Sequence, residues 1–450
     1  MFICQLPKDI IHSVCLYLEK RDVDSLSLCS VSLYNKSIQY KCNNFVLNIT
    51  KQKFSSNICQ QFKQIYYSPS PSILTHLTNF NQSINGILPL NLTHLTFGHN
   101  FNESVTSLLC LNNLTHLTFG KEFNEVIEGV LPPNLTHLTF GVNFNQPIRG
   151  MLPLNLTHLT FGQNFNHPIQ GILPSTLTHL TFRYSFNQPI EGMLSNNLTH
   201  LIFGYSFNQP IDGILPSTLT HLTFGEYFNQ PIDGILPSGL THLEFGYYFN
   251  QPIEEMLPSS LSHLRFGTSF DQPIQGILPS GLTHLTFGYD FNQPIKGILP
   301  SSLTHLEFGR YFNRPIEGIL PQSLTHLRFG DYFNQPIEQI SLLHNLTHLT
   351  FKDKFNQPIH GILSNNLTHL IFGCCFNRPI EGISLLKNLT HLTFGHFFNQ
   401  PIEGISLLKN LTHLTLGEKF DQKMEGLPIS LKYLNGHKLV FPRCKKFKNI

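Results

Sequence analysis

Histidine is the residue whose number and spacing in this sequence first suggest chemistry. The chain has 24 histidines, and 17 of them recur at nearly regular intervals between His76 and His413. Imidazole binds metals and transfers protons near neutral pH, so a metal or catalytic site has to be considered. All 17, however, stand at one position of a repeated string, and no recurring carboxylate accompanies them. We therefore predict a structural column, with no metal ligands, no catalytic residues and no cofactor.

A column of equally spaced imidazoles has an electrostatic consequence. Rings on neighbouring strands, about 5 Å apart, cannot all be protonated without mutual repulsion. Their pKa values in the folded chain are therefore expected below the ordinary value of about 6.5. Protonation then favours the unfolded chain, so we predict that acidification weakens the repeats.

The other residues that could do chemistry either belong to the repeated strings or stand alone. The nine cysteines include no Cys-x-x-Cys spacing, which argues against a zinc site. Asn-Leu-Thr occurs nine times and matches an N-glycosylation acceptor, but it recurs as part of the repeat. No nucleophile with a neighbouring base, glycine-rich phosphate loop or carboxylate pair stands apart. The sequence therefore disfavours an enzyme.

Composition narrows the partners and the compartment. The net charge is +2 and only 12% of the residues are charged, so neither nucleic acid nor an anionic membrane is a predicted partner. The first twenty residues lack the apolar core of a signal peptide. No stretch approaches the roughly 18 apolar residues of a membrane span. We expect a cytoplasmic or nuclear protein.

The sequence is dominated by about eighteen copies of one unit of 21 or 22 residues, of which 228–248 is typical. Leu240, Leu243 and Phe245 are expected to point inward, and His242 and Glu244 outward, because side chains alternate across a strand. Proline and glycine interrupt the remainder, which predicts loops and short turns. One unit cannot bury enough apolar surface alone, so neighbouring units must stack. This predicts a β-rich repeat solenoid with a parallel sheet.

The recurring strings Phe-Asn-Gln-Pro-Ile, Gly-Ile-Leu-Pro and Leu-Thr-His-Leu-Thr-Phe-Gly make the array similar to FNIP repeats, a leucine-rich-repeat variant. The resemblance covers roughly residues 73–431 and implies a leucine-rich-repeat-like solenoid with its sheet on the concave face. The Asn of Phe-Asn, such as Asn229, is expected to bond backbone groups of the adjacent turn. Asp271 and Asp421 replace this Asn in two units.

Two positions of the unit vary while the others stay nearly constant. The first, which we call the slot, is the pair of residues between the strand-following Gly and the next Phe. The second is the outward residue after His-Leu in the strand. Eight of the 14 tyrosines fall in the slot, and Tyr and Arg are enriched at protein interfaces. The predicted substrate-binding residues are Tyr184, Tyr205, Tyr227, Glu244, Tyr247, Tyr248, Arg265, Tyr289, Glu307, Arg310, Tyr311, Arg328 and Tyr332. Drift at unconstrained surface positions is the alternative.

Residues 6–38 stand outside the repeat and carry helical signals. Pro7 suits a helix start and Asp22 a second N-cap. Leu6-Pro7, the following Asp9-Ile10, and Asp22-Val23 resemble the F-box, a short helical module. That resemblance implies binding to the Skp-type adaptor of cullin ubiquitin ligases. The residues it assigns to adaptor binding are Leu6, Pro7, Ile10, Ile11, Val14 and Leu18. The alternative is an N-terminal cap on the first repeat.

These observations predict four segments. Residues 1–50 form a small α-helical F-box-like domain, 51–72 a connection, 73–431 the repeat array, and 432–450 a C-terminal cap with a basic tail. The two resemblances together imply a non-catalytic subunit of an SCF-type (Skp–cullin–F-box) ubiquitin ligase that holds an unidentified protein substrate. The alternative is a binding scaffold with no ligase role.

Overall fold

The computed structural model describes residues 90–435 except 149, 151 and 425, together with the short segments 45–48, 64–67, 73–77, 81–84, 88 and 437–438. The predicted F-box-like helices and the basic tail lie outside the described residues. The chain divides into two compact units, residues 1–207 and 208–450. Each is described by itself.

The first unit contains a two-stranded antiparallel sheet, β1 (Phe45–Asn48) with β2 (Gln64–Tyr67), and a parallel stack that begins at β3 (Ile73–Leu77). Consecutive strands of the stack pair in chain order up to β9. The other elements are β4 (His94–Phe97), the 3-10 helix η4 (Thr106–Cys110), β5 (His116–Thr118), β6 (His137–Thr139), β7 (His158–Thr160), β8 (His179–Thr181) and β9 (His200–Ile202).

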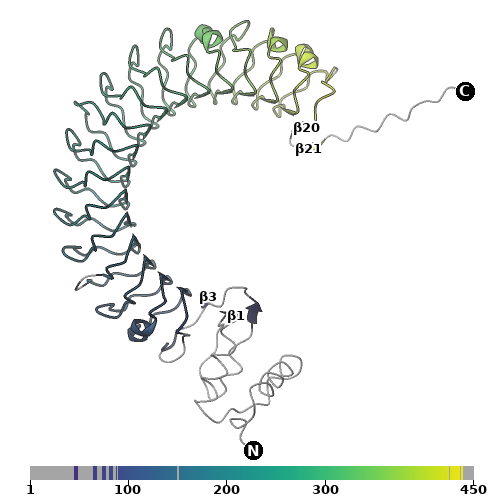
Figure 1. The fold of residues 1–450 in the computed structure, drawn as a ribbon. Helices are drawn as coiled ribbons and strands as arrows, with labels where there is room; N and C mark the ends of the chain where they lie inside the picture. The colour runs from purple at the N-terminus through teal and green to yellow at the C-terminus, as the bar shows by residue number, and fades with distance from the viewer. Residues whose placement is uncertain are drawn as a thin grey trace, which may run out of the picture. The chain divides into compact units, whose positions relative to one another are not determined.

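The second unit continues the same plan. Its strands pair in parallel and in chain order up to β20, and the last pair, β20 with β21, is antiparallel. Within this unit the strands line the inner side of a curve and the loops its outer side (Figure 1). The strands are β10 (His221–Thr223), β11 (His242–Glu244), β12 (His263–Arg265), β13 (His284–Thr286), β14 (His305–Glu307), β15 (His326–Arg328), β16 (His348–Thr350), β17 (His369–Ile371), β18 (His391–Thr393), β19 (His413–Thr415), β20 (Tyr433–Leu434) and β21 (His437–Lys438).

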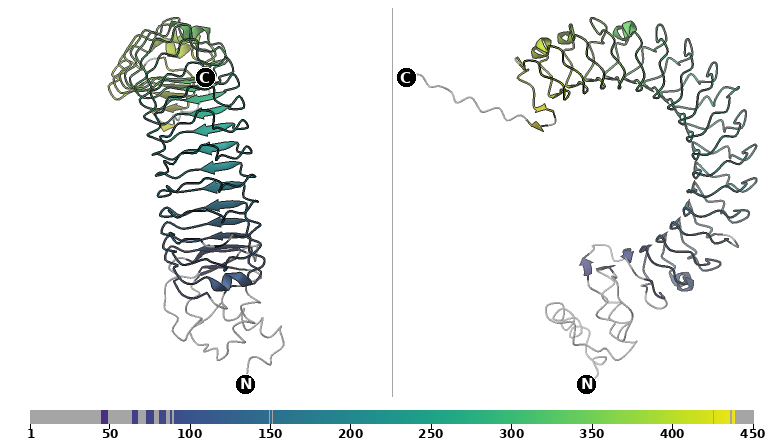
Figure 2. Two further views of the ribbon diagram at one scale, coloured as in Figure 1. Left: turned by 90° about the vertical axis from the view of Figure 1, so that its left-hand side faces the viewer. Right: turned by 180° about the vertical axis from the view of Figure 1, so that it is seen from behind.

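Strands β4–β19 share one burial pattern, and they account for sixteen complete turns of the predicted eighteen. The central Leu of each strand is buried and its two neighbours are half-buried or exposed. Leu240, Leu243 and Phe245 are buried as predicted. The two further copies are the terminal strands β3 and β20, which lack the full unit. The fold is thus a parallel β-solenoid with little helix, as the side view also shows (Figure 2).

Two phenylalanines of each unit build the centre of the solenoid. Phe245 follows its strand and stacks on Phe249, with ring centroids 3.9 Å apart. Phe249 in turn stacks on Phe270 of the next unit at 6.0 Å, with ring planes within 8° of parallel. Both columns are buried throughout the described repeats except at Phe420, which is half-buried at the end of the stack. Aromatic stacking therefore adds to apolar burial at every interface between units.

A glycine follows the strand in most units, where successive units lie close together. A Cβ added to Gly267 would collide with the carbonyl oxygen of Gly246 in the preceding unit. The same collision recurs at the equivalent glycines of neighbouring units. The strand-following position is therefore glycine in most units, because backbone approaches backbone there. Arg183 and Lys352 occupy it in two units.

Units of 22 residues carry their extra residue in the return loop. The Ile-Ser-Leu-Leu strings fall in the 3-10 helices η5 (Glu338–Leu342), η6 (Ile383–Leu385) and η7 (Glu403–Leu407). Their isoleucines, such as Ile405, and their second leucines, such as Leu408, are buried, while the first leucines, such as Leu407, are exposed. A 3-10 turn absorbs the additional residue without shifting the strand register.

An asparagine ladder ties the turns together. The side-chain oxygen of Asn229 accepts from the backbone N–H of Asn250 at 2.9 Å, and Asn250 accepts from Asp271 at 3.0 Å. Asp271 accepts from Asn292 at 2.9 Å in the same way. The ladder needs an acceptor oxygen and no side-chain N–H, which explains why aspartate replaces asparagine in that unit.

Replacing Asn250 tests this explanation. Asn250→Ala is expected to lower the free energy of unfolding by about 1–3 kcal/mol, because the Asp271 N–H loses its partner in a half-buried turn. Asn250→Asp, which retains the acceptor, is the matched control and should stay within about 0.5 kcal/mol of the wild type. Urea unfolding measures both values. Equal losses in the two variants would contradict the acceptor role.

Candidate protein-binding surface

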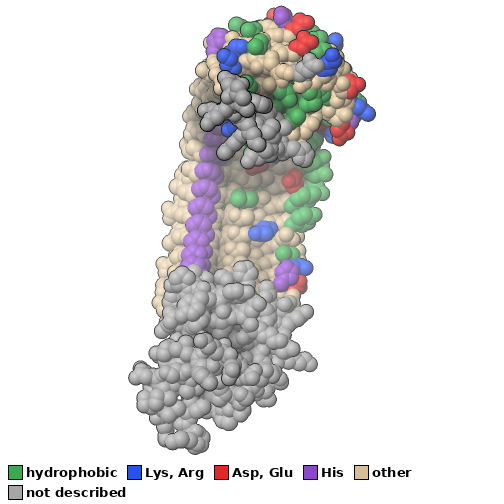
Figure 3. Space-filling model, turned by 90° about the vertical axis from the view of Figure 1, so that its right-hand side faces the viewer, with side chains coloured by type: hydrophobic (Ala, Val, Ile, Leu, Met, Phe, Trp, Pro, Cys, Tyr) green, Lys and Arg blue, Asp and Glu red, His purple; other side chains and the backbone are tan. Residues whose placement is uncertain are grey.

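The repeated histidines form a stack along the strand face. Rings of neighbouring strands lie 4.1 Å apart, as for His263 and His284 and for His284 and His305, with planes about 13° from parallel. Figure 3 shows the described part of this column as a purple stripe. Tyr433 occupies the same position in β20 and stacks on His413 at 4.5 Å. The column is a shared structural position, in agreement with the sequence interpretation.

A hydroxyl before each histidine fixes its ring. The Thr283 Oγ1 lies 2.9 Å from Nδ1 of His284 and 3.0 Å from the carbonyl oxygen of Ser262. A hydroxyl has one hydrogen, so when Thr283 donates it to the carbonyl, Nδ1 donates to the hydroxyl oxygen. Nε2 is then the unprotonated nitrogen. The neutral imidazole satisfies this network without any ligand.

Burial lowers the pKa values in the column. It lowers the pKa of His284 to about 4, with smaller contributions from neighbouring histidines, of which His305 is the largest. The pKa values of His137 and His348 are also lowered to about 4, with burial as the first cause. The predicted lowering of the histidine pKa values is confirmed for these residues. The main cause differs from the prediction, because desolvation outweighs repulsion between the rings.

No group of three or more histidine, cysteine or acidic side chains in the described part of the chain is arranged to hold a metal ion. The rings of the column are parallel and their nitrogens point the same way, whereas a metal site needs converging ligands. Cys374 and Cys375 occupy a slot, and burial raises the pKa of the Cys374 thiol. A thiol with a raised pKa is a poor nucleophile.

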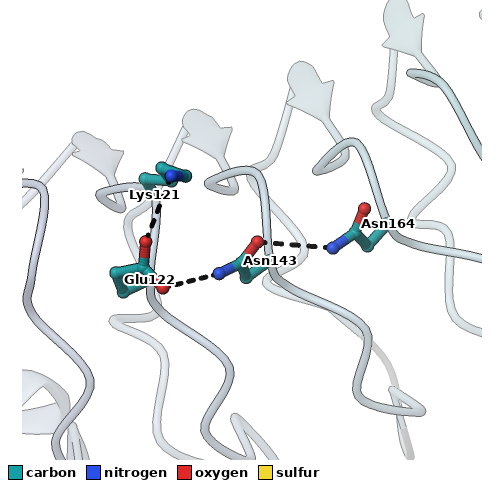
Figure 4. Close-up of polar contacts among 4 residues, drawn as sticks. All are labelled: Lys121, Glu122, Asn143 and Asn164. Atoms are coloured by element: carbon teal, nitrogen blue, oxygen red, sulfur yellow. Dashed lines mark hydrogen bonds and ion pairs between the residues drawn. The ribbon is translucent and has the colours of Figure 1, made fainter.

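In the first unit, the slots at residues 121–122, 142–143 and 163–164 carry polar side chains that bond to one another along the stack. Glu122 pairs with Lys121 at 3.4 Å and accepts from the Asn143 side chain at 2.6 Å. Asn164 then donates to Asn143 at 3.3 Å (Figure 4). Residues of successive slots therefore lie side by side and can make contact across units.

In the second compact unit, residues 208–450, several slots carry tyrosine. Tyr227 and Tyr248 stack with ring centroids 4.9 Å apart, and both are exposed. Further along, the Arg310 guanidinium lies 5.7–6.0 Å from the rings of Tyr289, Tyr311 and Tyr332. Cation–π contacts at this range hold an arginine in one orientation at an exposed site.

Arg310 also belongs to an ion-pair chain. Its Nε lies 3.3 Å from Asp331, and the other carboxylate oxygen of Asp331 lies 3.5 Å from Lys352. The three charges come from consecutive units. A tyrosine-flanked arginine with restricted motion has the composition and the preorganisation of an interface hot spot.

The variable strand position carries two ion pairs that sequence reasoning did not identify. Glu244 of β11 lies 3.4 Å from Arg265 of β12, and Glu307 of β14 lies 3.2 Å from Arg328 of β15. The parallel register sets each pair opposite across neighbouring strands. Opposite charges at the same position of adjacent units were the signal in the sequence from which this pairing could have been predicted.

The predicted substrate-binding residues fall into two sets. Tyr184 and Tyr205 stack on each other at 4.5 Å in the first unit. The others belong to the second unit, where all are half-buried or exposed. They make two clusters there, one around Tyr227, Tyr247 and Tyr248 and one around Arg310, with the charge pairs on the strands alongside. The predicted adaptor-binding residues lie outside the described residues.

The fold and this surface define the chain as a leucine-rich-repeat-like scaffold of a form suited to protein binding. The family comparison makes the class specific. The model of the FNIP Repeat matches residues 112–143, 144–185, 186–227, 228–269, 270–311, 312–354, 355–397 and 398–435. The chain belongs to the FNIP repeat family.

Solved structures include similar solenoids. The crystal structure of CroV588, described as a novel circular leucine-rich-repeat protein, is 51% identical with a TM-score of 0.72. The alignment covers 80% of this chain and 55% of that chain, so this chain spans about half the length of CroV588. YopM from Yersinia enterocolitica is 16% identical over 95% of this chain and 99% of its own, with a TM-score of 0.41. No curated protein matches the chain.

The described residues were also considered for membrane spans. Among them, no helix combines the length and the apolar character needed to cross a bilayer.

Proposed function

We propose that the chain is a non-catalytic substrate-recognition subunit of an SCF-type ubiquitin ligase. The head, residues 6–38, binds the Skp-type adaptor, and the repeat array holds a protein substrate near the ubiquitin-charged enzyme. The chain contributes proximity, which raises the effective concentration of the substrate without a catalytic group.

The observation that carries the substrate-binding half of this proposal is the aromatic slot of the second unit. Six tyrosines there are exposed, and three of them surround Arg310. Drift at an unconstrained position accounts for variety, but not for tyrosines gathered beside an oriented arginine. Tyr and Arg are the residue types that contribute most to interface affinity.

The adaptor-binding half rests on the sequence of the head. Leu6, Pro7 and Ile10 match the beginning of an F-box, and Val14 and Leu18 continue with helical spacing. An apolar helical face of this size fits a standard protein interface.

Co-purification with a Skp-type adaptor tests the ligase role. The wild-type chain should retain the adaptor, and the variant Leu6→Ala with Pro7→Ala should lose it. The matched control is Tyr248→Ala, which leaves the head unchanged and should retain the adaptor. Circular dichroism checks that the head variant keeps its β-rich array. Loss of adaptor in a folded head variant supports the proposal, and absence of adaptor from the wild type contradicts it.

The second candidate function is a binding scaffold without a ligase role, whose head caps the first repeat. It predicts that neither the wild-type chain nor the variant Leu6→Ala with Pro7→Ala retains the adaptor. It also predicts that Leu6→Ala with Pro7→Ala lowers the melting temperature of the array, because the cap is weakened.

A further inference from the structure

The two charge pairs on the strand face form a repeated pattern. Glu244 and Glu307 are three units apart, and so are Arg265 and Arg328. Both pairs join Nε to Oε1, at 3.4 and 3.2 Å. Thr286 separates the pairs, and Thr223 and Thr350 flank them in the same column. The face therefore reads negative, positive, neutral, negative, positive along the stack. We call these four charged residues the charge-pair surface.

The charges of this surface are available to a partner. The side chains of Arg265 and Arg328 are 65% and 48% exposed, and those of Glu244 and Glu307 are 47% and 44% exposed. Each internal contact uses one carboxylate oxygen and the Nε of the arginine. Arginine carries five N–H donors and a carboxylate two acceptor oxygens, so each group can bind a second partner.

Neighbouring ionisable groups leave the alternation of charge on the charge-pair surface unchanged. The pKa values of His284, His305 and His326, the rings next in the same strands, are lowered by burial, so these imidazoles are neutral at pH 7. In the slot, Arg310, Asp331 and Lys352 form a separate ion-pair chain. Apart from the histidines, the four residues of the charge-pair surface are the only ionisable residues within the strands β11–β15.

The spacing of the pairs selects the shape of the partner. Stacked rings on this face are 4.1 Å apart, and strands are about 4.8 Å apart. Charges within a pair are thus separated by about 4–5 Å along the stack, and equivalent charges of the two pairs by about 12–14 Å. On an α-helix, residues three apart rise about 4.5 Å and residues eight apart about 12 Å. In an extended chain, side chains on one face recur only every 6.6 Å or so.

We propose that the charge-pair surface binds an α-helix of a partner protein that carries charges in the order basic, acidic, basic, acidic at positions i, i+3, i+8 and i+11. At about 100° per residue, these positions lie within a sector of roughly 140° of the helix. Each helix charge then faces an opposite charge, as complementary interfaces require. This inference rests on the proposed protein-binding function of the array and names the partner element.

Two designed peptides of identical composition test the proposal. Both are alanine-rich helices with two lysines and two glutamates at i, i+3, i+8 and i+11. The matched peptide alternates lysine and glutamate, and the blocked peptide has both lysines before both glutamates. In either direction along the surface, the blocked peptide makes two favourable and two unfavourable contacts. Fluorescence anisotropy of labelled peptides, titrated with the full chain at low salt, should show at least fivefold tighter binding of the matched peptide.

A variant with unchanged net charge provides the control. Arg265→Glu with Glu307→Arg changes the surface to two negative charges followed by two positive ones, and should invert the preference between the peptides. The four side chains are exposed, so the array should remain folded. Should this variant unfold, the neutral pair Glu244→Gln with Arg265→Gln should reduce the preference of the intact array. At about 1 M salt, where charges are screened beyond roughly 3 Å, the preference should vanish.

Equal affinity of the wild type for both peptides, or no binding of either, overturns the proposal. So does a preference that the exchanged charges leave unchanged. None of these outcomes bears on adaptor binding, because residues 6–18 are untouched. The co-purification experiment therefore stands or fails separately.

Discussion

Lowering the pH from about 7.5 to about 5.5 is expected to reduce the melting temperature of the repeat array by at least about 10 °C. Burial lowers the pKa of nine described histidines of the column. In the unfolded chain these imidazoles return to about 6.5. The unfolded chain therefore binds more protons throughout the window between about 4 and 6.5.

The loss of stability at lower pH follows from proton linkage. Stability rises with pH wherever the unfolded state binds more protons, so the stabilising contribution is complete above about 6.5 and is lost as the pH falls. One pKa unit corresponds to about 1.4 kcal/mol. Solvent screening of half-buried rings reduces this free energy. We therefore expect each shifted histidine to lower the free energy of unfolding by on the order of 1 kcal/mol at pH 5.5. Carboxylates ordinarily titrate near 4, below the range of about pH 5.5–7.5 over which melting is compared.

A variant that the chain itself suggests provides the control. Tyr433 occupies the column and stacks on His413, so His284→Tyr with His305→Tyr preserves stacking and removes two titrating groups. Its melting temperature should depend less steeply on pH than that of the wild type. Differential scanning calorimetry at a series of pH values measures both slopes. A melting temperature of the wild type that stays level over this range would contradict the role of the column.

Truncating one ring of the phenylalanine column should produce the largest effect of any single substitution. Phe249→Ala is expected to lower the free energy of unfolding by about 3–5 kcal/mol. The ring is fully buried and contacts Phe245 at 3.9 Å, Phe270 at 6.0 Å and Phe228 at 6.2 Å. Removing it leaves a cavity in two adjoining interfaces of the stack.

The position of Phe249 within the second unit also predicts how unfolding changes. The stability of a solenoid is close to a sum over neighbouring interfaces, so a weak interior interface separates the flanking repeats. Urea unfolding of the variant, monitored by circular dichroism, should show two transitions. Tyr248→Ala, at the adjacent exposed residue, is the matched control and should change stability by less than about 1 kcal/mol. A single transition at the wild-type midpoint in Phe249→Ala would rule out this account.

The sequence predicted the fold because every unit repeats the same constraints. Inward Leu243 and Phe245, the strand-following glycine and the Asn acceptor recur at one spacing, and identical neighbours can satisfy them only by stacking in parallel. The substitution at Asp271 was visible in the sequence, but its tolerance needed the hydrogen bond to Asn292.

Other features were decided only by the tertiary structure. The sequence placed Glu244, Arg265 and Arg310 at variable positions, yet it did not show that Glu244 pairs with Arg265 or that three tyrosines surround Arg310. It also assigned the lowered histidine pKa values mainly to repulsion, whereas desolvation is the larger cause. Periodicity specifies which residues face outward, because side-chain direction is a local property of a strand. Contacts and burial depend on the distance between residues 21 positions apart, which the packing of whole units determines.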